Sequence, residues 1–159
     1  MIYLIRGILY ISMGCYLLFK GGSEFPLEDL IFYFSLFLTA DAGLLLFMRR
    51  GVHIFEIIID LLLVICLFSG LIDTIQFMIQ AVGAWYVVSG IAHIAMPKRP
   101  GISSFLVVAV GVVILLFGFI LFFREGMGMA GFMGMSGIFL LLPGLIMLIG
   151  PLAGRLRSR

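Results

Sequence analysis

Apolar and polar residues alternate along this chain in long blocks. Six apolar stretches are separated by short polar connections, and they cover residues 2–19, 27–47, 54–71, 75–96, 102–123 and about 129–149. A helix rises 1.5 Å per residue, so about 20 apolar residues cross the roughly 30 Å of hydrocarbon in a bilayer. The pattern therefore predicts an all-α fold, a polytopic membrane helix bundle with six transmembrane helices.

Local signals agree with the ends of these stretches. Pro26 comes just before the second stretch, and Asp73 with Gln76 has the spacing of a capping box at the start of the fourth. Pro97 follows the fourth stretch and favours its termination. Pro143 lies inside the sixth stretch and removes a backbone donor there, so we expect a kink in that helix.

Composition supports lipid as the main solvent. The chain has 159 residues, of which 64% are hydrophobic and 11% charged, and its mean hydropathy is +1.30. A soluble domain carries roughly 45–50% apolar and about 25% charged residues. Six spans leave no room for a separate soluble domain. We expect membrane lipids as the surroundings, and a net charge of +2 is too small to indicate a nucleic-acid partner.

Basic residues collect on one side of the predicted bundle. Only Lys20 and Arg124 fall on the other side, and the remaining eight of the ten Lys and Arg residues are Arg6, Arg49, Arg50, Lys98, Arg99, Arg155, Arg157 and Arg159. Because Lys and Arg are enriched in cytoplasmic loops, this asymmetry places both termini in the cytoplasm. We therefore expect a multi-pass protein of the cell membrane, the inner membrane where there are two.

A faint internal repeat groups the six helices. The odd-numbered stretches begin near residues 2, 53 and 103, which predicts one transmembrane domain over 1–159 built from three helical hairpins at about 1–50, 51–100 and 101–159. Gly7 and Gly14 lie one heptad apart, and so do Gly111 and Gly118. Small residues at this spacing let helix backbones approach closely in lipid.

Several of these residues resemble a known family. They are the Arg-Gly opening with its later glycine (Arg6, Gly7, Gly14), the Pro26 turn, the Asp41-Ala42-Gly43 segment, and Trp85 followed by Ser89, Gly90 and Ile91. In this organisation the chain resembles the HdeD-like acid-resistance proteins, small membrane proteins with six helices in three hairpins. The resemblance implies a non-enzymatic role in envelope or acid stress.

Ionisable residues inside apolar stretches are costly, by at least about 2.5–3.5 kcal/mol at a helix centre, and call for an explanation. The candidates form a predicted intramembrane polar cluster: Arg6, Asp41, Glu56, Asp60, His53 and His93. Arg6 and Asp41 are equidistant from the first hairpin turn, so an ion pair is possible at matching depth. His53, Glu56 and Asp60 share one helix face. The mirror position of Asp60 in its own hairpin lies near Trp85, which is not a basic partner.

Two interpretations of this cluster remain open. In the functional one, the cluster takes up protons and belongs to a small transporter or a proton-conducting protein. In the structural one, Arg6 pairs with the carboxylates and the outer groups reach water by snorkelling. We favour the structural interpretation.

The segment 126–137 is rich in glycine and methionine. Its four thioethers, Met127, Met129, Met133 and Met135, are ligands of a type that Cu(I) accepts. No cysteine or histidine is expected at that depth to complete a strong site. Gly131 and Gly134 belong to a three-residue repeat that fits helix packing with methionine filling gaps. Packing is the favoured interpretation, and we expect neither a resident metal nor another cofactor.

Catalytic arrangements are not indicated. Ser136 lies in a G-x-S-G string, but its expected depth differs from that of His93 by about 15 Å, too far for a nucleophile and its base. Gln76 and Gln80 favour hydrogen bonds across a helix interface rather than a polar path. The sequence therefore favours a membrane protein that is not an enzyme and that acts as a homo-oligomer or as an accessory subunit of a larger membrane complex.

Overall fold

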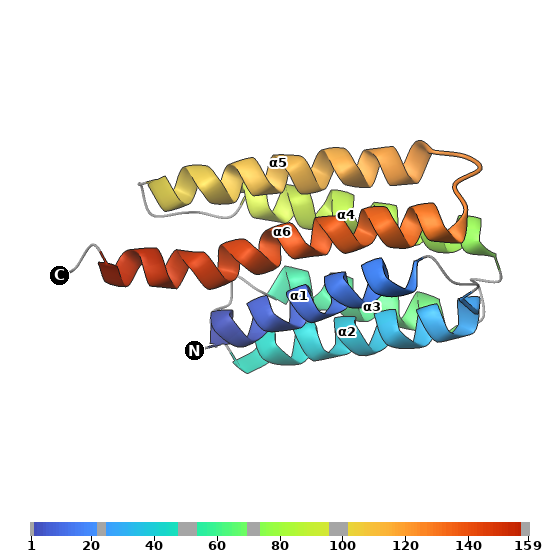
Figure 1. Ribbon diagram of the computed structural model, residues 1–159, viewed down its shortest axis with the longest axis horizontal. Coiled ribbons are helices and arrows are strands. Elements are labelled where there is room, and N and C mark those ends of the chain that lie inside the picture. Colours follow the sequence, from blue (N-terminus) through green and yellow to red (C-terminus); the bar gives the residue numbers. More distant parts are fainter. Residues whose placement is uncertain (1, 22–24, 48–53, 70–73, 96–101, 157–159) are drawn as a thin grey trace. The chain divides into compact units, whose positions relative to one another are not determined.

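Six α-helices make up the part of the chain that the structure, a computed structural model, describes: residues 2–21, 25–47, 54–69, 74–95 and 102–156. No strand occurs in these ranges. The helices are α1 (Ile2–Lys20), α2 (Leu27–Phe47), α3 (Ile54–Phe68), α4 (Ile75–Ala95), α5 (Ile102–Phe123) and α6 (Met129–Leu156) (Figure 1). The predictions of an all-α chain and of six helices at these positions are confirmed.

Two helix ends differ from the sequence expectation. α3 ends at Phe68, and Ser69 follows it with its amide donating to the Ile65 carbonyl and its hydroxyl to the Cys66 carbonyl. α6 continues seven residues past residue 149, through both Pro143 and Pro151, without a break in its assignment. The predicted kink at Pro143 is not tested by the helix assignment and stays a prediction.

Three helices are long and apolar enough to cross a membrane: Leu27–Phe47, Ile75–Ala95 and the part of α6 over Met129–Ile149. Among the described residues these three meet both conditions, and Val108–Phe123 is a shorter apolar helical stretch. These helices indicate a membrane protein. α3, with 15 residues, is about 22 Å long and falls short of a full span without its flanking residues.

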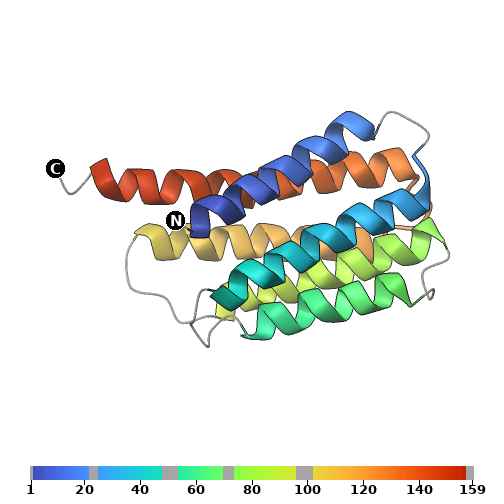
Figure 2. The same cartoon turned by 90° about the horizontal axis from the view of Figure 1, so that it is seen from below.

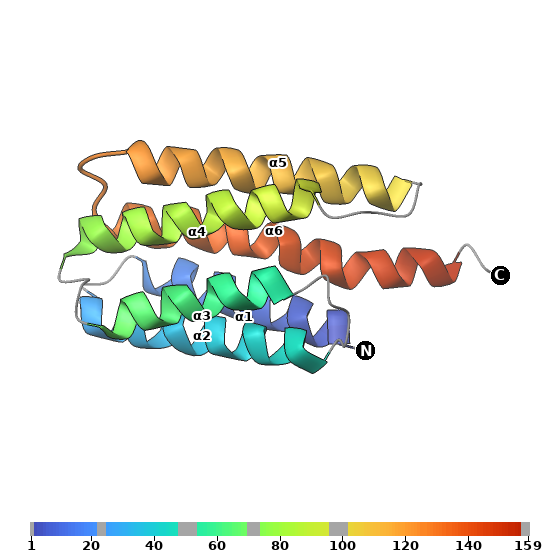
Figure 3. The same ribbon diagram turned by 180° about the vertical axis from the view of Figure 1, so that it is seen from behind.

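The chain divides into two compact units. One comprises Met1–Phe25 with Met129–Arg159, and therefore holds α1 and α6; the other is Pro26–Gly128, with α2 to α5. Inside the second unit, α2 packs on α3, α3 on α4, and α4 on α5. Consecutive helices in it run antiparallel, as Figure 3 shows. The predicted hairpins 1–50 and 101–159 each contribute one helix to each unit, and the hairpin arrangement stays a prediction.

Glycines hold α1 and α6 together in the first unit. A Cβ added at Gly7 would lie 3.0 Å from the Gly144 carbonyl oxygen, and one at Gly14 would lie 2.8 Å from the Gly137 oxygen. Each contact is also found from the α6 side. Because the two helices run antiparallel, Gly14, seven residues after Gly7, meets Gly137, seven residues before Gly144. Figure 2 shows the two helices lying antiparallel and crossing at a small angle. We call this contact the first glycine seam.

The second unit repeats this device between α4 and α5. A Cβ at Gly83 would lie 3.1 Å from the Gly118 carbonyl oxygen, and one at Gly90 would lie 2.8 Å from the Gly111 oxygen. These four residues form the second glycine seam. Backbones at such distances leave no space for a side chain, and the contacts bring Cα–H groups near carbonyl oxygens. Glycine spacing thus explains which helices pair inside each unit.

Polar contacts close the end of the second seam. The Gln76 side chain of α4 donates a hydrogen bond to the Arg124 carbonyl at the end of α5, over 3.3 Å. This confirms for Gln76 the predicted hydrogen bond across a helix interface. Gly126 follows with a φ of 72°, a left-handed conformation that favours glycine. The turn between α5 and α6 therefore depends on one glycine.

Candidate functional site

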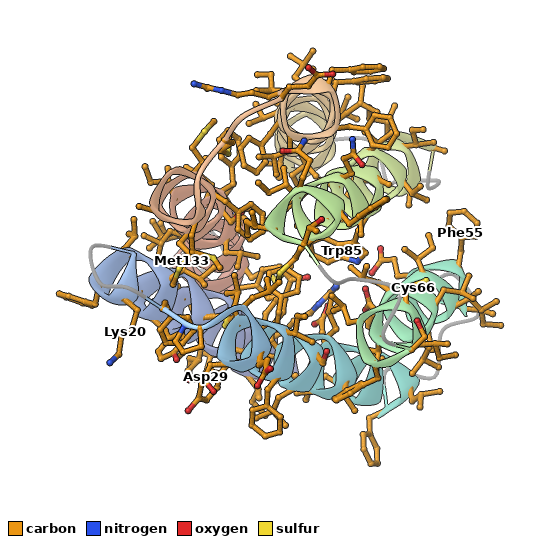
Figure 4. All side chains as sticks on the ribbon, turned by 90° about the vertical axis from the view of Figure 1, so that its right-hand side faces the viewer. Lys20, Asp29, Phe55, Cys66, Trp85 and Met133 are labelled. Carbon is orange, nitrogen blue, oxygen red and sulfur yellow. The ribbon has the colours of Figure 1, made fainter. Side chains whose placement is uncertain are left out.

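A buried carboxylate and a buried indole meet where α3 packs on α4. The Trp85 Nε1–H donates a hydrogen bond to Asp60 Oδ1 over 2.8 Å. Asp60 is 3% exposed and Trp85 is 5% exposed. Figure 4 shows Trp85 on the side of α4 that faces α3. A carboxyl group buried this deep in a bundle needs hydrogen-bond partners, and the indole N–H supplies one.

Aromatic side chains fix the position of the Trp85 ring. The Phe34 ring of α2 meets it edge-on, with centroids 6.1 Å apart, and the Tyr86 ring lies 4.7 Å away. Tyr86 in turn contacts Phe117 of α5, at 5.0 Å between centroids. Edge-to-face pairs of this kind hold rings in defined orientations. Trp85 therefore connects Asp60 to aromatic side chains from α2, α4 and α5.

Two more carboxylates are buried in the same unit. Asp41 of α2 is fully buried, and Glu56 of α3 is 7% exposed. Glu56 precedes Asp60 by four residues, so the two share a helix face as predicted. No group of three or more His, Cys, Asp or Glu side chains among the described residues is arranged to hold a metal ion.

Arg6 lies in the other unit. It is 5% exposed, and its Nη2 lies 3.3 Å from the Tyr10 hydroxyl, to which it donates, one turn further along α1. The guanidinium also stands over the Tyr10 ring, 5.4 Å from its centroid. Because Arg6 and Asp41 belong to different units, their predicted ion pair stays a prediction.

The two histidines differ in what the structure describes of them. His93 of α4 is half-buried, and its Nδ1 lies 2.9 Å from the Ser89 carbonyl oxygen, one turn earlier. His53 is outside the described residues. So are six basic residues on which the predicted orientation depends: Arg49, Arg50, Lys98, Arg99, Arg157 and Arg159.

The glycine and methionine segment divides between the two units. Met133 is fully buried, with its Cβ 3.3 Å from where a Gly21 side chain would begin, so it fills space beside the first glycine seam. Met127 is buried at the end of the second unit, and Met129 and Met135 are half-buried. A thioether cluster across all four stays a prediction.

Gly131 and Gly134 differ from the other four glycines for which we predicted helix packing. Gly131 is exposed. A Cβ at Gly134 would meet no described atom within 4 Å, whereas Gly7, Gly14, Gly111 and Gly118 all lie against a neighbouring helix. The three-residue repeat of this segment is therefore not the pattern that the close contacts follow.

Several residues of these contacts were not singled out from the sequence. Of the seam partners, Gly83 and Gly144 were not singled out, whereas Gly90 was noted only in the resemblance and Gly137 only as part of the three-residue glycine repeat. All four have the heptad spacing of Gly7 with Gly14, and that spacing would have found them. Trp85 was noted only as the residue at the level of Asp60. The signal in the sequence was its indole N–H, which can donate a hydrogen bond to a carboxylate although it carries no charge.

Comparison with known proteins adds no relative: no family model, curated protein or solved structure matches this chain. Function has to be argued from the arrangement of its own residues. That arrangement offers buried carboxylates, one of them held by an indole, in a unit where glycine contacts join two of the four helices.

Proposed function

We propose that this chain is a small multi-pass membrane protein, with all six helices in the bilayer and both termini in the cytoplasm, that acts without enzymatic chemistry. In this proposal it serves in envelope or acid stress, as the resemblance to the HdeD-like proteins suggests, or as an accessory subunit of a larger membrane complex.

One observation carries the proposal: three carboxyl groups within the helices are buried, while large apolar side chains are exposed on every helix. Asp41, Glu56 and Asp60 are buried, while every helix exposes large hydrophobic residues, among them Ile8, Leu36, Ile65, Phe77, Leu116 and Ile138. A soluble monomer rarely exposes contiguous apolar patches of more than a few hundred Å². Lipid or a partner protein is the environment that fits such an exterior.

Copurification from native membranes tests the proposal. We expect the tagged chain, extracted in mild detergent, to carry a stoichiometric protein partner or a second copy of itself. Gly118→Leu disrupts the α4–α5 contact inside the chain, so we expect it to reduce that association through loss of the folded helix pair. Gly43→Leu, at a helical glycine where an added Cβ would meet no described atom within 4 Å, is the matched control. A strictly monomeric chain without partners in native lipid would refute both proposed roles.

The buried carboxylates favour a second candidate, a proton-conducting protein that uses Arg6, Asp41 and Asp60. Ionisable residues inside membrane bundles often mark proton relays. Liposomes that contain the purified protein and a pH-sensitive dye distinguish the candidates. Flux that falls in Asp41→Asn would support conduction, and wild-type flux no greater than that of the variant would exclude it.

A further inference from the structure

The contact between Asp60 and Trp85 has a property on which the proposed stress and subunit roles do not depend. A hydrogen bond whose acceptor is a charged carboxylate is roughly twice as strong as one between neutral groups. The 2.8 Å contact at this buried position is therefore sensitive to whether Asp60 carries a proton. Its strength is set by charge, in a place where bulk water does not screen it.

The geometry points to a proton-binding site at Asp60, in which the Trp85 indole holds the charged carboxylate and loosens its hold when a proton binds. The proton comes from water, and the bond that forms is an O–H on the Asp60 carboxyl group. The indole keeps its own N–H throughout. Nothing is oxidised or reduced. The result of protonation is a weaker hydrogen bond between Asp60 of α3 and Trp85 of α4.

Trp85 is placed to pass this change on. Its ring contacts Phe34 of α2, and its neighbour Tyr86 contacts Phe117 of α5. Edge-to-face contacts depend on ring orientation, so a shift of the indole alters packing on both sides. Close glycine contacts hold α4 against α5, so we expect α3 to be the helix that moves. Protonation of Asp60 should therefore loosen α3 more than α5.

Other titratable groups on the helices around Asp60 have to be separated from it. They are Glu56 and Cys66 on α3 itself, Asp41, Glu28, Asp29 and Tyr33 on α2, and Tyr86 and His93 on α4. Of these, Glu56 and Asp41 are the buried carboxylates, and each has an amide counterpart of nearly the same shape. Variants at these two positions test whether the response belongs to Asp60.

The chain has a single tryptophan, which makes the site directly observable. Labelling tryptophan with ¹⁵N gives one indole N–H signal in the NMR spectrum of the full chain in nanodiscs. We expect this signal to move in one step as the buffer is changed from neutral to acidic. Asp60→Asn keeps an acceptor oxygen but cannot take up a proton, so its signal should stay still. Glu56→Gln and Asp41→Asn should keep the step.

Trp85 fluorescence is the second measurement. Electron density moves away from the indole nitrogen on excitation, so a negative charge beside that nitrogen lowers the emission energy. We expect acid to shift wild-type emission to shorter wavelength, and Asp60→Asn to show the shifted emission already at neutral pH. Trp85→Phe supplies the background from tyrosine.

Three results would overturn the inference. One is an indole signal and an emission that do not respond to pH in the wild-type chain, a test that needs no variant to fold. The others are a wild-type response in Asp60→Asn, and loss of the response in either Glu56→Gln or Asp41→Asn. The inference rests on the proposed membrane bundle but not on its partner, stress role or flux. Failed copurification would leave the titration intact, and a flat titration would leave the partner proposal standing.

Discussion

The Trp85 indole contributes one hydrogen bond to the buried Asp60 carboxyl group. A buried acceptor that loses its donor retains its full desolvation penalty, about 1–3 kcal/mol. Asp60 accepts from Trp85 Nε1 over 2.8 Å, with both residues buried. At this scale the stability of the α2–α5 unit depends on a donor that carries no charge.

Trp85→Phe removes that donor and keeps an aromatic ring against Phe34. We expect a loss of about 1–3 kcal/mol in the free energy of unfolding, because the Asp60 oxygen loses this partner. Titration of the folded protein with SDS in mixed micelles, followed by circular dichroism, measures it. In an Asp60→Leu background the same change should cost less than half as much. Equal losses in the two backgrounds would show that ring packing, not the hydrogen bond, is responsible.

Gly126 is a second position where one residue matters. Its φ of 72° lies in the left-handed region, which costs a residue with a side chain about 1–2 kcal/mol. Gly126→Ala should therefore destabilise the chain by about 1 kcal/mol, even though an added Cβ meets no described atom within 4 Å. Gly128→Ala, two residues on with equally open space and no left-handed φ, should change stability little. Equal effects of the two variants in the SDS titration would contradict the conformational explanation.

Two helix pairs in this chain, α1 with α6 and α4 with α5, meet through close backbone contact at glycines. Both glycine seams use two glycines per helix, one heptad apart, in antiparallel register. In lipid, where burial of apolar surface gives no net drive between helices, close packing and Cα–H contacts replace it. Glycine contacts therefore explain why α1 packs on α6 and α4 packs on α5.

A methyl group is enough to test the second seam. A Cβ at Gly118 would lie 2.5 Å from the Val87 amide nitrogen, and the helix backbone there cannot give way cheaply. Gly118→Ala should destabilise the chain by about 1–3 kcal/mol, the usual cost of overpacking. Gly43→Ala, in α2 with open space, should be neutral or slightly stabilising, since alanine favours helix. A loss of stability in Gly43→Ala but not in Gly118→Ala would contradict the close helix contact at Gly118.

Much of the element scale was readable from the sequence, and the reasons are physical. Blocks of apolar residues set the helix positions, because each block must satisfy its backbone internally in an apolar medium. Partner choice was less accessible. Gly7 and Gly14 carried a packing signal, but nothing in the chain order says that their partners lie in α6 rather than in the next helix. The hydrogen bond between Trp85 and Asp60 was not predicted, because only basic residues were considered as partners for Asp60.

At the scale of the whole molecule, basic residues set the proposed orientation. Eight of the ten Lys and Arg residues fall on the side that carries both termini when all six helices cross the bilayer. An odd number of crossings would separate the termini, and α3 is the helix whose crossing is least supported by length, with 15 residues. Orientation thus depends on whether the flanking residues of α3 extend it.

Reporter fusions resolve this point. We expect a fluorescent protein fused after Arg159 to fluoresce, because it folds in the cytoplasm, and alkaline phosphatase at the same position to be inactive. A phosphatase fused after Thr74, between α3 and α4, should be active, since three crossings place that connection outside. The matched control is a fusion after Phe47, between α2 and α3, which should be inactive. If α3 lies flat at the cytoplasmic surface instead, the Thr74 fusion becomes inactive and the Arg159 phosphatase active, and the depth at which Asp60 meets Trp85 would have to be that of the interface.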